Sequence, residues 1–157
     1  MSKQQVQCII ILSFATVLIS IDQLVKILID QNISLNESVA FIPKVLSITH
    51  VHNSGAAWNL LDGHTCFLTF ITIIAAGVIF YYFWRSIKQS KWLNIALLLM
   101  FSGAVSNFID RVLHGYVIDM FQTKFIDFPV FNMADSYLVV GVCLLIIYIF
   151  IIDRKGQ

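Results

Sequence analysis

Residues 8–29 read CIIILSFATVLISIDQLVKILI, an apolar run that contains two ionisable side chains, Asp22 and Lys26. A helix needs about 20 predominantly apolar residues to cross the hydrocarbon core of a bilayer. No small-residue cleavage site follows the run, and Asp22 interrupts it, which disfavours a cleaved secretory signal. The run therefore predicts a membrane-spanning helix that remains part of the chain.

Three further apolar runs follow, at residues 67–84, 92–113 and 134–152. Of the 157 residues, 59% are hydrophobic and 12% are charged, whereas an ordinary soluble domain carries about 25% charged residues. Four helices and their loops fill a chain of this length. We therefore predict one all-α membrane domain over residues 1–157, with four transmembrane helices and no separate soluble domain.

The basic residues predict how these helices are oriented. Four spans put both ends of the chain on one side of the membrane. That side would carry most of the basic residues, namely Lys3, Arg85, Lys88, Lys91, Arg154 and Lys155, and the other loops hold only Lys44 and Lys124. Cytoplasmic loops are enriched in lysine and arginine. Both ends and the loop at residues 85–91 are therefore predicted to be cytoplasmic.

The two remaining loops, at about residues 30–66 and 114–133, are predicted to be extracytoplasmic. The first contains a β-branched segment, Val45–Val51, followed by turn-forming residues at 53–55. This pattern is typical of a strand and its turn. We predict a small extracytoplasmic β-sheet; that it forms a cradle, with Asn53–Trp58 as a lid loop, is a hypothesis that depends on the substrate implied by the resemblance below. The second loop includes Pro129 and is predicted to run extended toward the fourth helix.

Polar residues in different helices are predicted to lie at the same depth. At 1.5 Å per residue, Asp22 lies roughly 21 Å from the inner end of the first helix. Asn107 and Asp110 lie roughly 22 and 27 Å from the inner end of the third helix. In a core about 30 Å thick, these positions fall in the outer third. Asn132 and Asp135, at the start of the fourth helix, belong to the same outer layer.

Some of these residues have a structural interpretation when each is taken alone. Asp22 and Lys26 are spaced i,i+4 and are close enough to form an ion pair, which we favour over a catalytic role. Lys26 also lies near enough to the interface to extend toward it. Asp110 faces away from Asn107 and can bond a neighbouring helix.

The remaining polar residues also have simpler interpretations. Arg111, spaced i,i+4 from Asn107, can extend to the interface at the helix end. Asp135 or Asn132 can cap the fourth helix. Asp119, taken alone, is a loop carboxylate in contact with solvent.

The cysteines and histidines give no pattern of a disulfide framework or a metal site. Cys8, Cys66 and Cys143 are odd in number, and two of them lie in apolar runs. His50, His52, His64 and His114 lack the spacings of zinc sites, although His50 and His52 would share one face of a strand. We predict no metal and no cofactor. The net charge of +1 does not indicate a nucleic acid partner.

Five short motifs occur in order along the chain: DQLVK at 22–26, NSGAAW at 53–58, SNFIDR at 106–111, VIDM at 117–120 and FNMAD at 131–135. Each motif is weak alone. Together they make the chain similar to the lipoprotein signal peptidase family, also called signal peptidase II, over nearly its whole length. This sequence departs from the family at Ser106, where glycine is usual, and at Met120, where phenylalanine is usual.

The resemblance implies a function and a set of site residues. Asp119 and Asp135 would be the catalytic aspartates, and the residues that shape or support the site would be Asn53, Gly55, Asn107, Arg111 and Asn132. The activity implied is a membrane aspartyl endopeptidase that removes the signal peptide of a diacylglyceryl-modified prolipoprotein, cutting just before the lipidated cysteine. It also implies inhibition by the cyclic peptide globomycin and a location in the bacterial cytoplasmic membrane, with the site near the outer face.

The residues suit this chemistry, because two carboxylates held close together share one proton and so provide an acid and a base. One chain carries all these groups, so a monomer in contact with membrane lipid suffices. The main alternative is a small transporter or proton-conducting protein that uses Asp22, Lys26, Asp110 and Arg111 as a relay. The sequence shows no internal repeat and the polar layer is shallow, which argues against a transporter.

Overall fold

The computed structural model describes residues 3–56, 58, 60–87 and 90–152. Its helices and strands, in chain order, are α1 (Lys3–Asn32), β1 (Ser38–Ile42), β2 (Leu46–Asn53), α2 (Thr65–Ser86), α3 (Lys91–His114), β3 (Val117–Thr123), α4 (Met133–Ile147) and the π-helical turn η2 (Tyr148–Ile152). Four residues that enter the predictions above lie outside the described residues: Ala57 of the predicted lid, and the basic residues Lys88, Arg154 and Lys155.

Within the described residues, four helices are long and apolar enough to cross a membrane. They cover residues 5–32, 65–86, 91–114 and 133–150, and each predicted run coincides with one of them. Large apolar side chains such as Phe14, Phe70, Trp92 and Val139 are exposed along these helices, as expected for a surface that faces lipid. The predicted fold class, four membrane helices with a small sheet, is confirmed.

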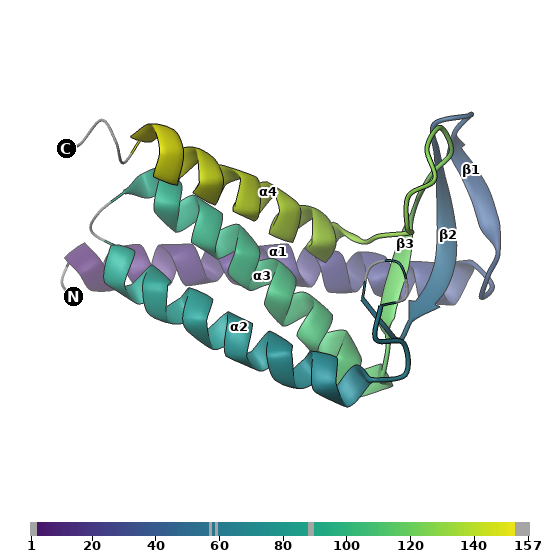
Figure 1. Cartoon of the computed structure of the whole chain (residues 1–157), viewed down its shortest axis with the longest axis horizontal. Helices are drawn as coiled ribbons and strands as arrows, with labels where there is room; N and C mark the ends of the chain where they lie inside the picture. Colours follow the sequence, from purple (N-terminus) through teal and green to yellow (C-terminus); the bar gives the residue numbers. More distant parts are fainter. Residues whose placement is uncertain (1–2, 57, 59, 88–89, 153–157) are drawn as a thin grey trace.

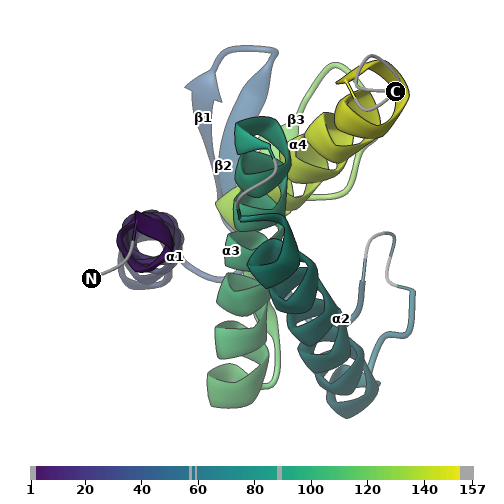
Figure 2. The same ribbon diagram turned by 90° about the vertical axis from the view of Figure 1, so that its left-hand side faces the viewer.

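The sheet lies at one end of the helices. Figure 1 shows that α1 begins and α4 ends at the opposite end of the bundle. Figure 2 shows α3 between α2 and α4, with α1 on another side. Glycines let α3 and α4 approach closely: a Cβ atom on Gly141 would lie 2.8 Å from the carbonyl oxygen of Ala96, and one on Gly103 would collide with the carbonyl oxygen of Ala134. Small residues permit such contacts between membrane helices.

The three strands form an antiparallel sheet in the order β1-β2-β3. The predicted strand at 45–51 corresponds to β2, and the segment predicted to run extended after the third helix begins with β3. A register shift between Ile48 and Val51 interrupts the pairing of β2 with β3. The chain then returns alongside β3, because Phe131 and Phe121 exchange backbone hydrogen bonds of 3.1 and 2.8 Å. This return brings the start of α4 next to β3.

Candidate active site

Asp119 lies in β3 and is 2% exposed. The antiparallel register pairs Val51 with Asp119 and Asn53 with Val117, so the end of β2 lies beside this carboxylate. The Asn53 Nδ2 donates to Asp119 Oδ2 at 2.8 Å. On the other side, the Asn132 Nδ2 donates to Asp119 Oδ1 at 2.7 Å. Two amides from two different elements therefore hold the Asp119 carboxylate.

Asp135 lies in the first turn of α4, and the residue that caps this helix is Asn132. The Asn132 Oδ1 accepts from the Asp135 backbone N–H at 2.9 Å, and the Asp135 Oδ2 accepts from the Asn132 backbone N–H at 3.1 Å. This reciprocal pair is a capping box. Of the two capping residues considered from the sequence, Asn132 is the N-cap and Asp135 is not, because Asp135 occupies the third position of the helix.

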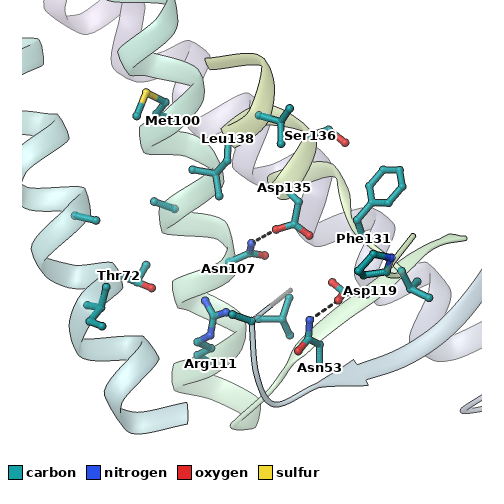
Figure 3. Close-up of a pocket in the computed structure, with 18 of the residues that line it drawn as sticks. Asn53, Thr72, Met100, Asn107, Arg111, Asp119, Phe131, Asp135, Ser136 and Leu138 are labelled. Atoms are coloured by element: carbon teal, nitrogen blue, oxygen red, sulfur yellow. Dashed lines mark hydrogen bonds between the residues drawn. The ribbon is translucent and has the colours of Figure 1, made fainter. Parts of the chain in front are cut away.

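Asn107 links the two carboxylates through Asn132. The Asn107 Nδ2 donates to Asp135 Oδ1 at 2.7 Å, and the Asn107 Oδ1 accepts from Asn132 Nδ2 at 3.2 Å. Because Asn132 also donates to Asp119, a continuous chain of amide contacts joins Asp119 to Asp135. Figure 3 shows both carboxylates on the same side of the pocket, with Asn53 and Asn107 bonded to them.

Neither carboxylate has a cationic partner: among the described residues, every ion pair that involves an aspartate engages Asp22, Asp110 or Asp30. Burial, and then the negative charge of Asp135, raise the pKa of Asp119 to about 7. The hydrogen bonds from Asn53 and Asn132 and the more distant charge of Lys26 oppose this rise in the pKa. Removal from water and a neighbouring like charge both favour the neutral acid. The Asp119 carboxyl can therefore hold a proton at neutral pH.

A cavity of about 870 Å³ opens beside the two carboxylates. Its walls come from α2, α3, α4 and the segment before α4, and most of them are apolar, including Ile71, Ala75, Met100, Leu138 and Val139. Trp58 and Phe128 also line the cavity, and their ring centroids are 5.8 Å apart in an edge-to-face contact. The site thus combines an apolar chamber with two acidic side chains on one wall.

Arg111 lines this chamber, and Gly55 is in contact with it. The Arg111 Nη2 donates to the Gly55 carbonyl oxygen at a long 3.4 Å, whereas the buried Arg111 Nε has no hydrogen-bond partner among the described residues. A Cβ atom on Gly55 would lie 2.9 Å from the Leu60 carbonyl oxygen, so a side chain would displace this loop. The Gly55 backbone N–H also donates to Asn53 Oδ1 at 3.0 Å. Arg111 therefore faces the cavity with unused donor capacity.

A second polar cluster lies next to the carboxylate pair. Lys26 Nζ is 2.8 Å from Asp22 Oδ2, 2.8 Å from Asp110 Oδ2 and 3.0 Å from Asn107 Oδ1. The side chains of Lys26, Asp22 and Asp110 are all buried. The prediction that Lys26 can extend toward the interface is wrong, because Asp110 and Asn107 on α3 supply partners that the sequence of α1 alone does not reveal.

Sequence reasoning missed two members of this cluster, Gln23 and Ser106. The Ser106 Oγ donates to Asp22 Oδ2 at 2.6 Å, and the Gln23 Nε2 donates to Asp110 Oδ1 at 2.6 Å. The other Asp22 oxygen, Oδ1, accepts from the Ala134 backbone N–H at 2.9 Å. Asp22 on α1 therefore satisfies one of the unpaired donors at the start of α4. The signal for Gln23 was present, since a polar amide inside an apolar run needs a partner.

Comparisons with known proteins agree, over most of the chain, with the family resemblance given by the five motifs. Residues 14–151 match the family model for signal peptidase (SPase) II. The chain is 49% identical over 142 residues to a lipoprotein signal peptidase of Enterococcus faecalis, an alignment that covers 90% of this chain and 88% of that protein. It is 43% identical over 149 residues to a lipoprotein signal peptidase of Streptococcus agalactiae, with coverage of 95% and 97%.

Two solved structures share the fold. A bacterial membrane enzyme determined by the in meso method at 2.3 Å resolution superposes with a TM-score of 0.86 at 38% identity, covering 94% of this chain and 90% of that one. A second bacterial membrane enzyme, determined by the same method at 1.9 Å, gives a TM-score of 0.80 at 39% identity, with coverage of 90% and 92%.

Proposed function

This chain belongs to the signal peptidase (SPase) II family, and from that premise we propose that it is an aspartic-type endopeptidase that removes the signal peptide from prolipoproteins in the bacterial cytoplasmic membrane. The observation that carries the proposal is the pair Asp119 and Asp135, two carboxylates bonded by amides and without a cationic partner in the described residues. The pair lines one wall of an apolar chamber.

The two aspartates share the proton that hydrolysis needs. In the proposed mechanism, the ionised carboxylate takes a proton from a water molecule as it attacks the scissile carbonyl carbon. The protonated carboxyl donates its proton to the carbonyl oxygen, and a proton then passes to the leaving amine as the C–N bond breaks. No covalent intermediate forms. The two groups titrate as one coupled unit, so the starting proton belongs to the pair rather than to one residue.

Asn53, Asn107 and Asn132 act as supports in this mechanism. Their amides keep both carboxylates in fixed positions without neutralising them. Arg111 carries an unused buried Nε and is positioned over Gly55, so we assign it to orienting backbone carbonyls of the substrate. The lid role of Asn53–Trp58 rests on the contact between Trp58 and Phe128, both of which line the chamber.

The shape of the site suits a lipid-modified substrate. The apolar walls can accept the last residues of a signal peptide that arrives as a membrane helix, while the diacylglyceryl chains of the cysteine stay in lipid. The cut would then fall just before the lipidated cysteine. We propose that both ends of the chain are cytoplasmic and that the sheet and the aspartates lie toward the outer face. One chain supplies every residue of the site, so we propose a monomer that a globomycin-type peptide inhibits by occupying the chamber.

A proton relay or transport function is not favoured. Lys26 uses its three donor positions on Asp22, Asp110 and Asn107, and these three neighbours also accept hydrogen bonds from Ser106, Gln23 and Asn132, respectively. Lys26, Asp22 and Asp110 do not line the cavity beside Asp119, so their closed cluster suits a structural role rather than a transport path.

The function is tested by incubating the purified full chain with a diacylglyceryl-modified prolipoprotein and, in parallel, with the same prolipoprotein lacking the lipid. We expect a gel shift only with the modified substrate, a new amino-terminal cysteine by mass spectrometry, and loss of the shift when globomycin is added. Intact modified substrate after incubation with a folded enzyme would contradict the proposed activity. Equal cleavage of both forms would contradict the proposed substrate class.

A further inference from the structure

Outside the candidate active site, three side chains from α1 and β2 converge near the sheet: Asp30, His50 and His52. One ligand atom from each of the three lies within 4.8 Å of the other two. His50 and His52 lie two residues apart on β2, and Asp30 comes from the last turn of α1. From the sequence we expected no metal site, because the histidines lack the spacings of zinc sites, and Asp30 is distant from both histidines along the chain.

His50 is held with one nitrogen free. Its residue is 3% exposed, and its Nδ1 lies 2.8 Å from the Ile33 carbonyl oxygen. That contact requires Nδ1 to carry a proton, and in the neutral tautomer with this arrangement the lone pair is on Nε2. The Nε2 atom is buried and has no hydrogen-bond partner in the described part of the chain. Metal-binding histidines typically donate their second N–H to a carbonyl or carboxylate in this way.

The distance to Asp30 fits coordination better than a hydrogen bond. The His50 Nε2 and the Asp30 Oδ1 are 3.5 Å apart, and the Asp30 side chain is 53% exposed. A hydrogen bond between nitrogen and oxygen is normally no longer than about 3.2 Å. Two ligands about 2.0–2.2 Å from one tetrahedral zinc ion are separated by about 3.3–3.5 Å.

His52 supplies the third donor. Its Nε2 is also buried without a partner in the described residues, and its ring stacks on Tyr116 at a centroid distance of 3.7 Å. Burial, and then the neighbouring His50, lower the pKa of His52, which favours the neutral ring. A neutral imidazole is the form that binds a metal.

We propose that Asp30, His50 and His52 form a binding site for a divalent transition metal ion of the zinc class, with a fourth position open to water. Two imidazoles and one carboxylate suit Zn²⁺, whereas Mg²⁺ and Ca²⁺ prefer oxygen ligands. The ion would tie the end of α1 to β2, directly before Asn53, which donates to Asp119. The site is independent of the proposed peptidase chemistry, since no step of that reaction uses these three side chains.

The proposal is tested on the full chain, purified in detergent and treated with chelator, with Zn²⁺ alone as the probe. We expect Zn²⁺ to raise the Tm of the wild type in a dose-dependent way and Co²⁺ to give the visible absorption of a tetrahedral site. Asp30→Asn is nearly isosteric, and His52→Phe keeps a ring to stack on Tyr116. Each should weaken Zn²⁺ binding by at least about tenfold, comparable to or larger than the loss of an outer-shell partner.

The matched control is His64→Ala, which removes an exposed histidine outside the cluster and should bind Zn²⁺ as the wild type does. Unchanged Zn²⁺ binding in both Asp30→Asn and His52→Phe would overturn the proposal, and so would equal loss of binding in His64→Ala. If Asp30 and His50 form only an ion pair, Asp30→Asn changes the Tm of the metal-free protein and leaves the Zn²⁺ titration as in the wild type, which also overturns it.

Discussion

Two pairs of aspartates lie side by side in the protein, with Asp135 half-buried and the other three buried, and the pairs differ in their partners. Asp22 and Asp110 lie on either side of the Lys26 ammonium. Asp119 and Asp135 have only amide and backbone donors in the described residues. Asn107 separates the two pairs: its Oδ1 accepts from Lys26, and its Nδ2 donates to Asp135.

This difference teaches that burial alone does not mark a reactive carboxylate. A cation within hydrogen-bond distance keeps an aspartate ionised and fixed. Without one, burial draws the carboxyl toward its protonated form, as with Asp119, whose pKa is raised to about 7. The first pair therefore suits a structural role, and the second suits acid and base chemistry.

The largest effect is expected from removing either reactive carboxyl. Asp119→Asn and Asp135→Asn should each abolish cleavage in a folded protein, because an amide keeps the shape and can neither take nor deliver the proton. General acid and base contributions are typically about 10² to 10⁴ each, and they are not additive within one unit. The double variant should therefore be scarcely slower than either single one in a gel assay of prolipoprotein conversion.

The control for this comparison is Glu37→Gln, which changes an exposed carboxylate in the loop before β1 and should cleave at the wild-type rate. Asp135→Asn also tests the structural alternative. Its amide oxygen can still accept from the Asn132 backbone N–H, so a merely structural Asp135 would tolerate the change. Substantial cleavage by either folded single variant would exclude the acid and base pair.

The next largest effect is expected at Lys26. Lys26→Met leaves Asp22 and Asp110 buried without their shared cation, and breaking a buried ion pair costs about 3–5 kcal/mol. Asp22→Asn should cost less, because Lys26 keeps Asp110 as its partner. We expect both variants to lower the Tm more than they lower turnover per folded molecule. Thermal melts and active-site-normalised kinetics measure the two quantities, and Lys124→Met, on an exposed lysine, is the control.

A stable Asp22→Asn protein with no activity would contradict this assignment. The order of the two variants is a second check. If Asp22→Asn were more damaging to the Tm than Lys26→Met, the lysine would not be the centre of the cluster, and the contact between Asp22 and the Ala134 backbone N–H would be the dominant one.

A pH-dependent effect of intermediate size is expected at Asp119. Its pKa rises from 3.8 to about 7 on folding, so between these values the folded protein binds more protons than the unfolded one. Its contribution to stability is therefore complete below about pH 4 and is lost as the pH rises to about 7. The loss amounts to at most about 4 kcal/mol. As the pH rises across this range, the Tm of Asp119→Asn should exceed that of the wild type by an increasing amount. A Tm difference that does not change with pH would contradict the raised pKa.

Much of the fold was predictable because the signal is continuous along the chain. Twenty or so apolar residues at 8–29, or at 134–152, predict a span without reference to any other segment. No comparable sequence pattern marked strand β1. Every residue of Ser38–Ile42 is exposed, so the strand has no buried face to produce an apolar pattern. Its strand conformation depends on pairing with β2.

The sequence pointed to individual residues of the candidate site, but not to most of the contacts between them. Five motifs pointed to Asp119 and Asp135 through a family resemblance. The i,i+4 spacing of Asp22 and Lys26 predicted a contact within one helix. No spacing rule reports that Asp110 reaches Lys26 from α3, or that Asp30 approaches His50, because these contacts depend on how the helices and the sheet pack.

The smallest effect is expected at Arg111, which belongs neither to the structural cluster around Lys26 nor to the reactive pair of carboxylates. It is a half-buried cation at the chamber wall, yet it forms no ion pair with either reactive carboxylate within the described residues. Arg111→Lys keeps the charge and removes the planar fork of donors that can hold a carbonyl on two atoms. If Arg111 orients the substrate backbone, kcat/KM should fall about tenfold, equivalent to about 1.4 kcal/mol, while the Tm stays close to the wild type. Arg85→Lys, on an exposed arginine in the last turn of α2, provides the matched control. Wild-type kinetics for Arg111→Lys would reduce Arg111 to a charge at the helix end, as the sequence alone allowed.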